Sequence, residues 1–278
     1  MAITPQEFDL IRTFLQEHSG ILIGKGKEYL VENRLAVLLV QNGLDNFTQL
    51  HQKLSVESSP LRAKVIDAMT TNETLWFRDA SFFSALSGSV IPTLFEKAKT
   101  KPKVRVWSAA CSTGQEPYSI SMLLDAHARK AGAEGTNLLG KFEIMATDIS
   151  PSAISIAKAG MYSQLAISRG MRDSFLERYF VKKGAAYEVT PEIRSRVSFK
   201  LFNLKDAFTP HGRFDFILCR NVLIYFSEEL KRNIYDKMSQ TLERDGLLAI
   251  GASESSRGFT DRFEQVMLGG AALLKTKR

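Results

Sequence analysis

The sequence of 278 residues predicts an α/β protein with a small all-helical N-terminal domain, a mostly parallel sheet and a small antiparallel β-subdomain insert. Three observations support this prediction. Amphipathic helical patterns fill residues 1–75. Beyond residue 100, apolar runs typical of buried strands alternate with helical patterns, which indicates a parallel sheet with helices on both faces. Residues 162–200 interrupt this alternation with short β-rich segments.

The N-terminal domain is expected to contain several short helices. The first spans residues 5–18, because Thr4 and Pro5 signal an N-cap and a first turn. Its apolar residues recur at helical spacing: Phe8, Ile11, Phe14 and Leu15. Further helices are expected over residues 27–42, 46–56 and 60–71. We therefore expect a helical domain over residues 1–75, followed by a linker helix within residues 76–100 that spans 80–100.

The α/β domain is expected over residues 101–278. Its strands are predicted at residues 103–108, 142–147, 214–219 and 246–251, and its helices at 115–131, 151–160 and 227–243. Residues 262–276 are expected to form a closing antiparallel hairpin. The β-subdomain, about 162–200, is expected to include strands at 187–189 and 197–201.

Composition narrows the class of protein. Hydrophobic residues make up 44% and charged residues 24%, which is typical of soluble globular proteins. No run approaches the roughly 20 apolar residues of a membrane span, and no secretory signal opens the chain. Two cysteines in a chain of this size make the cytoplasm the expected location. Four scattered histidines and no cysteine cluster predict no metal site.

The chain is basic, with a net charge of +7 and a pI of about 9.3. The excess of lysine and arginine lies beyond residue 70. Such a surface suggests an acidic partner, either nucleic acid or a glutamate-rich protein, and the alternative is that the charge serves solubility alone.

Small and acidic residues follow the first two predicted strands, where open α/β sheets bind ligands. The first turn, residues 109–114, contains Gly114 alone, whereas the dinucleotide fingerprint needs three glycines. Glu116 at the start of the next helix would repel a pyrophosphate but could accept a bond from an ammonium group. Asp148 ends the second strand and suits the two hydroxyls of a ribose, while Ser150 is better placed to cap the following helix.

Two further segments carry candidate binding residues. Asn203 follows a predicted strand and could place its amide beside an adenine ring. Residues 72–78 are polar but contain Trp76 and Phe77, and they end in Arg78. Arginine suits bidentate recognition of a carboxylate.

Five segments resemble, in order and across both domains, the chemotaxis receptor methyltransferases (the CheR family), which methylate glutamate side chains of bacterial chemoreceptors. The segments are residues 70–78, 107–119, 146–148, 219–226 and 251–254. The resemblance implies a Rossmann-like class I methyltransferase domain that binds S-adenosylmethionine and releases S-adenosylhomocysteine, without a metal. It also implies that the helical domain recognises the receptor.

The resemblance also implies the roles of individual residues. The family's cofactor contacts correspond here to Asn72, Thr74, Arg78, Glu116, Asp148, Asn203, Leu204, Arg220 and Asn221. Arg78 and Tyr225 are expected to face the transferring methyl group and the substrate carboxylate. The expected partners are the cytoplasmic helices of a chemoreceptor, with no nucleic acid and no insertion into the membrane.

Two segments depart from the family pattern. Relatives that bind a peptide at the receptor C-terminus have a longer, glycine-rich loop in the β-subdomain, whereas residues 182–187 are short and contain one glycine. We therefore expect recognition without this tether. The second helix is arginine-rich in some relatives and keeps only Arg34 here, so it carries less positive charge to attract an acidic receptor.

Three other functions share parts of this pattern. A dehydrogenase would have a similar sheet, but the glycine fingerprint is missing. Many base-amino methyltransferases of nucleic acids carry an Asn/Asp-Pro-Pro-aromatic motif where this chain has residues 220–223. A non-catalytic S-adenosylmethionine sensor would keep the fold, and a methyl-transfer assay separates it from an enzyme.

Overall fold

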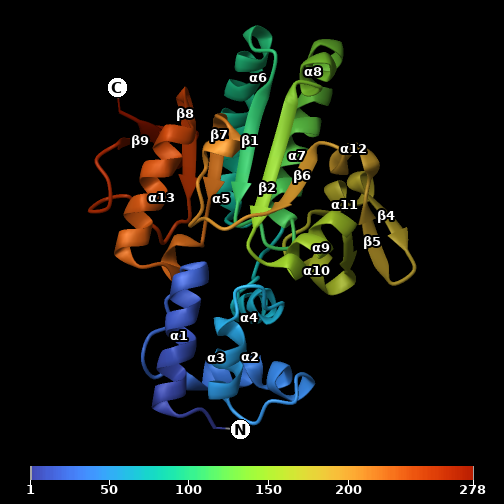
Figure 1. Ribbon diagram of the computed structural model, residues 1–278. Coiled ribbons are helices and arrows are strands. Elements are labelled where there is room, and N and C mark those ends of the chain that lie inside the picture. The colour runs from blue at the N-terminus through green and yellow to red at the C-terminus, as the bar shows by residue number, and fades with distance from the viewer. Residues whose placement is uncertain (1, 278) are drawn as a thin grey trace.

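The computed structural model describes residues 2–277. The helical domain consists of α1 (Pro5–Ser19), α2 (Glu28–Gln41), α3 (Phe47–Ser55) and α4 (Leu61–Met69), as expected. Thr4 caps α1 in a reciprocal capping box with Glu7. These helices enclose a hydrophobic core of their own, separate from the sheet, with Phe8, Ile11, Leu35 and Leu50 at its centre. Figure 1 shows this domain, in blue, below the sheet.

The expected linker helix over residues 80–100 is present but is not regular throughout. It consists of α5 (Ala80–Ala85), a π-helical turn (Leu86–Val90) and α6 (Ile91–Thr100). Pro92 lies in the first turn of α6 and cannot donate the usual backbone hydrogen bond to the preceding turn. The π-helical turn, in which backbone hydrogen bonds span five residues instead of four, lies just before this proline.

The central sheet has seven strands: β1 (Val104–Ala109), β2 (Phe142–Asp148), β6 (Val197–Leu201), β7 (Phe214–Cys219), β8 (Leu242–Ile250), β9 (Phe263–Leu268) and β10 (Ala271–Thr276). Their order is β6-β2-β1-β7-β8-β10-β9. The first five are parallel, and β9 and β10 form the expected antiparallel hairpin.

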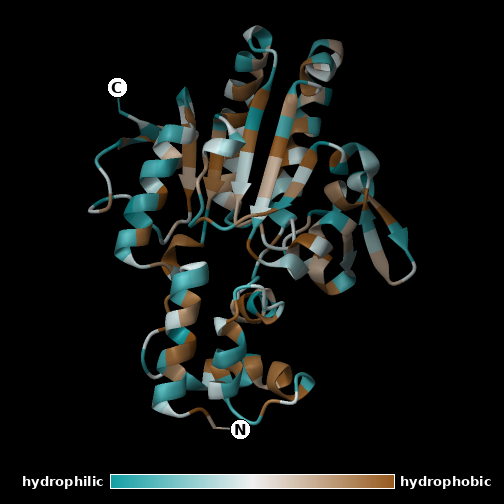
Figure 2. Ribbon diagram, viewed as in Figure 1, coloured by the Kyte–Doolittle hydropathy of each residue, from teal (hydrophilic) through white to brown (hydrophobic). Residues whose placement is uncertain are grey.

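Helices cover both faces of the sheet (Figure 1), which gives the predicted α/β class. Val106 and Ile144 face a core shared with α6 and α7 (Gln115–Lys130). Trp107 and Ile217 face the opposite core, which is shared with α13 (Glu228–Thr241). The central strands are accordingly apolar along most of their length (Figure 2). No helix within residues 2–277 is both long and apolar enough to span a membrane.

A small antiparallel sheet forms the β-subdomain. It pairs β3 (Met161–Ser163), β5 (Ala186–Val189) and β4 (Phe180–Lys183) in that order. Short helices α10 (Gln164–Ser168), α11 (Asp173–Tyr179) and α12 (Pro191–Arg194) surround it.

The expectation that residues 197–201 belong to this antiparallel insert is wrong. They form β6, which pairs in parallel with β2 from Ile144–Val197 to Asp148–Leu201. Only Phe199 of this strand is buried. The reason for the error is that an edge strand of a parallel sheet, half exposed, has the same alternating pattern as a strand of an antiparallel sheet.

Four α-helices within residues 2–277 had no counterpart in the prediction: the three short helices of the β-subdomain and one that follows α7. α8 (Gly132–Leu139) follows α7 directly and precedes β2, after which the chain continues into α9 (Pro151–Ala159). Glycine is a weak helix former, so the sequence of α8 gives little sign of a helix. Gly135 nevertheless allows α8 to pack closely against α7. A Cβ at Gly135 would lie 2.4 Å from the carbonyl oxygen of Ala128 on α7.

Candidate active site

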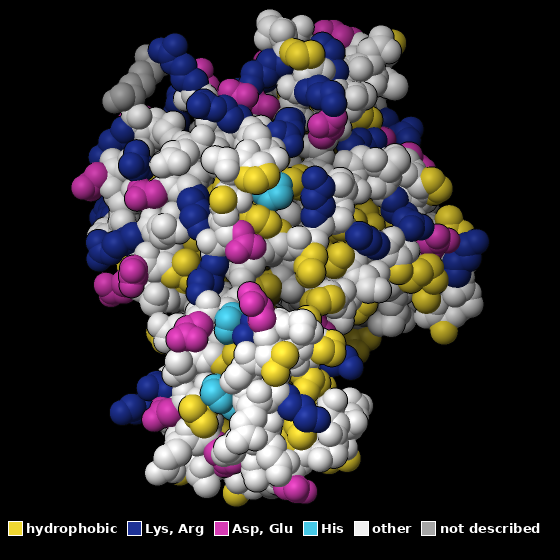
Figure 3. Space-filling view, viewed as in Figure 1, with side chains coloured by type: hydrophobic (Ala, Val, Ile, Leu, Met, Phe, Trp, Pro, Cys, Tyr) yellow, Lys and Arg dark blue, Asp and Glu magenta, His cyan; other side chains and the backbone are white. Residues whose placement is uncertain are grey.

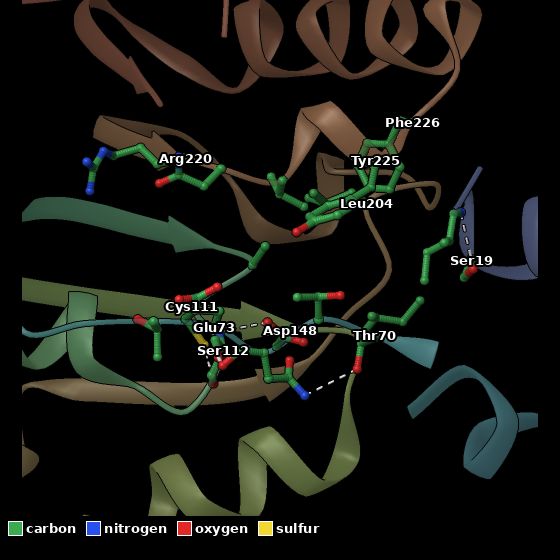
Figure 4. A pocket seen from close by; sticks show the side chains of 18 of the residues that line it. Ser19, Thr70, Glu73, Cys111, Ser112, Asp148, Leu204, Arg220, Tyr225 and Phe226 are labelled. Carbon is green, nitrogen blue, oxygen red and sulfur yellow. Dashed lines mark hydrogen bonds between the residues drawn. The ribbon is translucent and has the colours of Figure 1, made fainter. Parts of the chain in front are cut away.

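A cavity opens at the carboxyl ends of β1, β2 and β7. From β1 the chain first adds strands on one side of the sheet (β2, then β6) and later on the other (β7, then β8), so β1 marks the point where the topology switches sides. This is the position at which open α/β sheets bind ligands. The helical domain closes the cavity from the other side, through Ser19, Ile21 and Met69. Figure 4 shows Arg220, Leu204 and Tyr225 on one side of the opening and Ser112 and Asp148 on the other.

The structure brings all ten of the predicted site residues to this one cavity. They are Asn72, Thr74, Arg78, Glu116, Asp148, Asn203, Leu204, Arg220, Asn221 and Tyr225. They come from four separate stretches of the α/β domain and from the segment that joins it to α4. Their binding and catalytic roles remain predictions.

Asp148 is buried, with 6% of its surface exposed. Its two oxygens accept backbone N–H groups from Ser112 at 2.7 Å and Ser150 at 2.9 Å. Burial raises the pKa of Asp148, and the backbone hydrogen bonds oppose that increase. Ser150, as expected, caps α9 by accepting the N–H of Ala153 at 3.0 Å. The Asp148 carboxylate is therefore not needed as a helix cap and borders the cavity.

Glu116 and Arg220 form an ion pair at the floor of the cavity, with 3.0 Å between Oε2 and Nη1. The other Glu116 oxygen accepts the Ser108 hydroxyl at 2.7 Å. Arg220 Nη2 also contacts Asp79 Oδ2 at 2.5 Å. Arg220 Nε is buried, and no atom of residues 2–277 accepts a hydrogen bond from it. The Glu116 carboxylate and the Arg220 guanidinium thus lie side by side in the lining of the cavity.

Arg78 differs from Arg220 in its electrostatic environment. It is half-buried, and its Nη1 donates only to the backbone carbonyl of Glu73, at 3.2 Å. No carboxylate within residues 2–277 forms an ion pair with it. Its positive charge is therefore available to an anion that enters the cavity.

Tyr225 lies at the end of a 3₁₀ turn, η3 (Leu223–Tyr225), that follows β7. Its ring is half-buried, and no described residue is hydrogen-bonded to its hydroxyl. Its backbone carbonyl accepts the N–H of Leu22 at 2.8 Å. This bond connects the helical domain to the loop that carries Tyr225.

Asn203 makes a contact that the sequence did not reveal. Its side-chain amide nitrogen donates to the carbonyl of His18 at 2.8 Å, and Lys205 Nζ donates to the carbonyl of Gln16 at 3.1 Å. These carbonyls belong to the last turn of α1, where the Gln16 carbonyl also accepts the N–H of Gly20 at 3.0 Å. Asn203 thus borders the cavity while holding the end of α1 against the α/β domain. Ser19 and Ile21 also close this side of the cavity. In the sequence, Ser19 only follows the first predicted helix, and Ile21 belongs to a short apolar segment over residues 20–24.

The segment after α4 crosses the cavity under hydrogen-bond restraint. Asn72 Nδ2 donates to Thr70 Oγ1 at 3.2 Å and Ser150 Oγ at 3.3 Å, and its carbonyl accepts the Ser112 hydroxyl at 3.0 Å. Within residues 2–277, every non-glycine residue with a positive φ lies at or near this cavity: Phe77, Asp79, Ala110, Ser112 and Asn221, with φ of 50°, 65°, 58°, 50° and 59°. Such conformations cost energy and cluster at functional sites.

Comparison with known families identifies both parts of the chain. Residues 72–270 match the family described as the CheR methyltransferase SAM-binding domain, and residues 6–70 match the CheR methyltransferase all-alpha domain. The chain belongs to the CheR methyltransferase family. The two matched regions correspond to the α/β domain with its linker and to the helical domain.

Proteins of this family from several bacteria are similar over their whole length. The chain is 43% identical to Chemotaxis protein methyltransferase 1 of Pseudomonas aeruginosa over 281 residues, covering 100% of both. It is 40% identical to Chemotaxis protein methyltransferase of Vibrio parahaemolyticus, covering 100% of this chain and 99% of that one. The corresponding protein of Borreliella burgdorferi is 34% identical and covers 92% of this chain.

Proposed function

We propose that this protein transfers a methyl group from S-adenosylmethionine to glutamate carboxylates in the cytoplasmic domain of a chemoreceptor, giving glutamate methyl esters. The observation that carries the proposal is the composition of the cavity. It combines a buried carboxylate, an acid–guanidinium pair, an arginine with no carboxylate partner among the described residues and a tyrosine. The names of the relatives supply the chemotaxis context.

The residues of the cavity fit S-adenosylmethionine. Asp148 would accept the ribose hydroxyls, since each of its oxygens retains a lone pair beyond its backbone bond. The paired Glu116 and Arg220 would meet the ammonium and carboxylate of the methionine end, since both residues line the cavity. Asn203 and Leu204 would border the adenine. When bound, S-adenosylmethionine supplies a methyl group already activated on a positively charged sulfur.

The substrate needs little activation by the protein. An unperturbed glutamate side chain has a pKa of about 4.3, so at neutral pH it is an anion and a nucleophile. Its oxygen forms the new bond to the methyl carbon while the carbon–sulfur bond breaks, so no proton moves and no general base is required. Arg78 and Tyr225 would hold the carboxylate in line for attack, and positioning of this kind lowers a barrier substantially.

Substrate capture is proposed to depend on the methylated helices themselves. On the face shown in Figure 3, more lysine and arginine side chains lie over the α/β domain than over the helical domain. The β4–β5 hairpin is short, and Ala185, Ala186 and Tyr187 carry side chains where a tether peptide would need close backbone approach. The enzyme would then act in the cytoplasm without a receptor tail.

The test is methyl transfer from radiolabelled S-adenosylmethionine to purified receptor cytoplasmic fragments. We expect labelling of the receptor fragment, and none of DNA or RNA supplied in its place. The matched control is the Arg78→Ala, Tyr225→Phe double variant, which should keep the fold but transfer little. S-adenosylmethionine binding with no transfer to any receptor fragment would instead indicate a sensor.

A further inference from the structure

A carboxylate outside the predicted set organises the loop that carries Tyr225. Glu254 lies three residues beyond Gly251, which directly follows β8, while Asn221 lies two residues beyond the end of β7. β7 and β8 are parallel neighbours, with Cys219 opposite Ile250. The two strand ends therefore lie side by side, and the Glu254 side chain connects the segments that follow them.

The Glu254 carboxylate accepts five backbone N–H groups. Oε2 accepts those of Asn221 at 2.8 Å and Gly251 at 2.6 Å. Oε1 accepts three consecutive ones: Val222 at 3.0 Å, Leu223 at 2.8 Å and Ile224 at 3.3 Å. The chain thus wraps around the carboxylate and presents its donors as it would to a bound anion.

This contact supports a conformation that the loop would not adopt without compensation. Asn221 has a φ of 59°, in the left-handed region. Glu254 binds its N–H and then caps the beginning of η3, so the strained residue and the turn are fixed by one group. Tyr225 is the last residue of that turn. The direction in which its ring enters the cavity follows from the geometry of the turn.

Gly251 provides independent support for a tightly fitted site. A Cβ at this position would lie 2.7 Å from both Glu254 Oε2 and Asn221 Nδ2, and 2.9 Å from Asn221 N. These distances are shorter than van der Waals contact, so a side chain there would displace the carboxylate or the loop.

We propose that Glu254 is a positioning residue for methyl transfer, acting through Tyr225. The proposal rests on the proposed function and adds a residue to its machinery. Glu254 lines no part of the cavity itself and is only half-buried. It holds residues 221–225 in the one arrangement that brings Tyr225 to the cavity.

The experiment is a double-mutant cycle on kcat. Glu254→Gln exchanges one acceptor oxygen for an amide nitrogen that faces backbone donors, and we expect kcat to fall by roughly tenfold or more. In a Tyr225→Phe background the same substitution should lower kcat by less than about threefold, because the residue through which it acts is already disabled. Equal losses in both backgrounds would overturn the proposal, as would an unchanged kcat for Glu254→Gln.

A matched control separates positioning from general stability. Glu7 also accepts backbone N–H groups, from Thr4 and Thr48 at 3.0 Å each, but lies far from the cavity in α1. Glu7→Gln should lower the melting temperature and leave kcat within about twofold. A comparable loss of kcat in this control would show that Glu254→Gln acts only through stability.

Two further measurements keep the proposal testable if Glu254→Gln does not fold. Gly251→Ala places a methyl group against the Glu254 carboxylate and Asn221 without changing Glu254 itself. It should lower kcat in the wild type, but should cause little further loss in a Tyr225→Phe background. Amide hydrogen exchange of residues 221–224 should accelerate in either variant and stay unchanged in Glu7→Gln. Wild-type protein that transfers no methyl group would overturn the proposed function and this role together. Wild-type transfer with an unaffected Gly251→Ala variant would overturn the role of Glu254 alone.

Discussion

The Asp148 carboxylate allows a quantitative prediction for cofactor binding. Hydrogen bonds to charged groups contribute about 1.5–3 kcal/mol each. Asp148→Ala removes the acceptor proposed for the ribose, so at least one such bond is lost from the complex. A loss of about 1.4 kcal/mol corresponds to tenfold in affinity. We therefore expect the Kd for S-adenosylhomocysteine, measured by isothermal titration calorimetry, to rise by roughly tenfold or more.

The same substitution also has an effect on folding that must be separated from binding. It leaves the N–H groups of Ser112 and Ser150 without their carboxylate, at about 1–3 kcal/mol for each group that stays unsatisfied. This cost applies to the free and the bound protein and so lowers the melting temperature rather than the affinity. Circular dichroism shows whether the fold persists at the titration temperature.

Asp125 supplies a matched control. It is also buried, at 5% exposure, but its partners are Arg129 and Tyr179, on α7 and α11, away from the cavity. Asp125→Ala should lower stability and leave the affinity for S-adenosylhomocysteine unchanged. Unchanged affinity in a folded Asp148→Ala protein would refute the placement of Asp148 at the ribose.

Four further predictions concern catalysis, pH, substrate capture and packing. Tyr225→Phe should lower kcat more than cofactor affinity, and Arg78→Ala should lower both, as steady-state kinetics and calorimetry would show; wild-type turnover by Tyr225→Phe would end its assignment. Burial raises the pKa of Asp148, and binding of S-adenosylhomocysteine is proposed to need the ionised carboxylate. The affinity of the wild type for S-adenosylhomocysteine should therefore fall as the pH is lowered toward that pKa. The difference in affinity between the wild type and Asp148→Asn should decrease over the same pH range. The raised pKa also means that the folded protein binds the proton of the Asp148 carboxyl group more tightly than the unfolded chain does. The contribution of Asp148 to the free energy of unfolding therefore decreases as the pH rises from its unfolded-state pKa to its folded-state pKa. Deleting the receptor C-terminal tail should leave the methylation rate within about twofold, and raising salt should lower it; micromolar binding of the isolated tail peptide would contradict this. Trp76→Ala should destabilise the fold by about 3–5 kcal/mol in chemical denaturation, since Trp76 is 1% exposed and packs edge-on against Tyr162 and Phe180.

Much of the fold follows from local patterns that are strong in this sequence. The mostly apolar runs of β1 and β7 indicate strands buried on both faces, and every residue of β7 is buried. The N-cap signals at Thr4 and Ser150 predict the helix starts correctly because each acts within one helical turn. The assignment of β6 is wrong because the partner of an edge strand is decided by tertiary packing, which leaves no local signal.

Most of the predicted site residues reach one cavity because parallel strands bring their carboxyl ends to one edge, whereas Asn72, Thr74 and Arg78 reach it on the segment that follows α4. What the sequence could not predict is how polar groups are partnered. The pairing of Glu116 with Arg220 joins residues about a hundred positions apart, and the contact of Asn203 with His18 joins the two domains. Glu254 belongs to a segment that resembles the family, but its role depends on a turn whose conformation is visible only in three dimensions.

The product that we expect is a glutamate methyl ester on a chemoreceptor. The most direct measurement combines radiolabelled transfer to a receptor cytoplasmic fragment with mild alkali treatment of the labelled protein. Carboxyl methyl esters hydrolyse in base, so we expect the label to be released as volatile methanol. Replacing the accepting glutamates with alanine should abolish labelling. A label that survives alkali, or that persists without those glutamates, would contradict it.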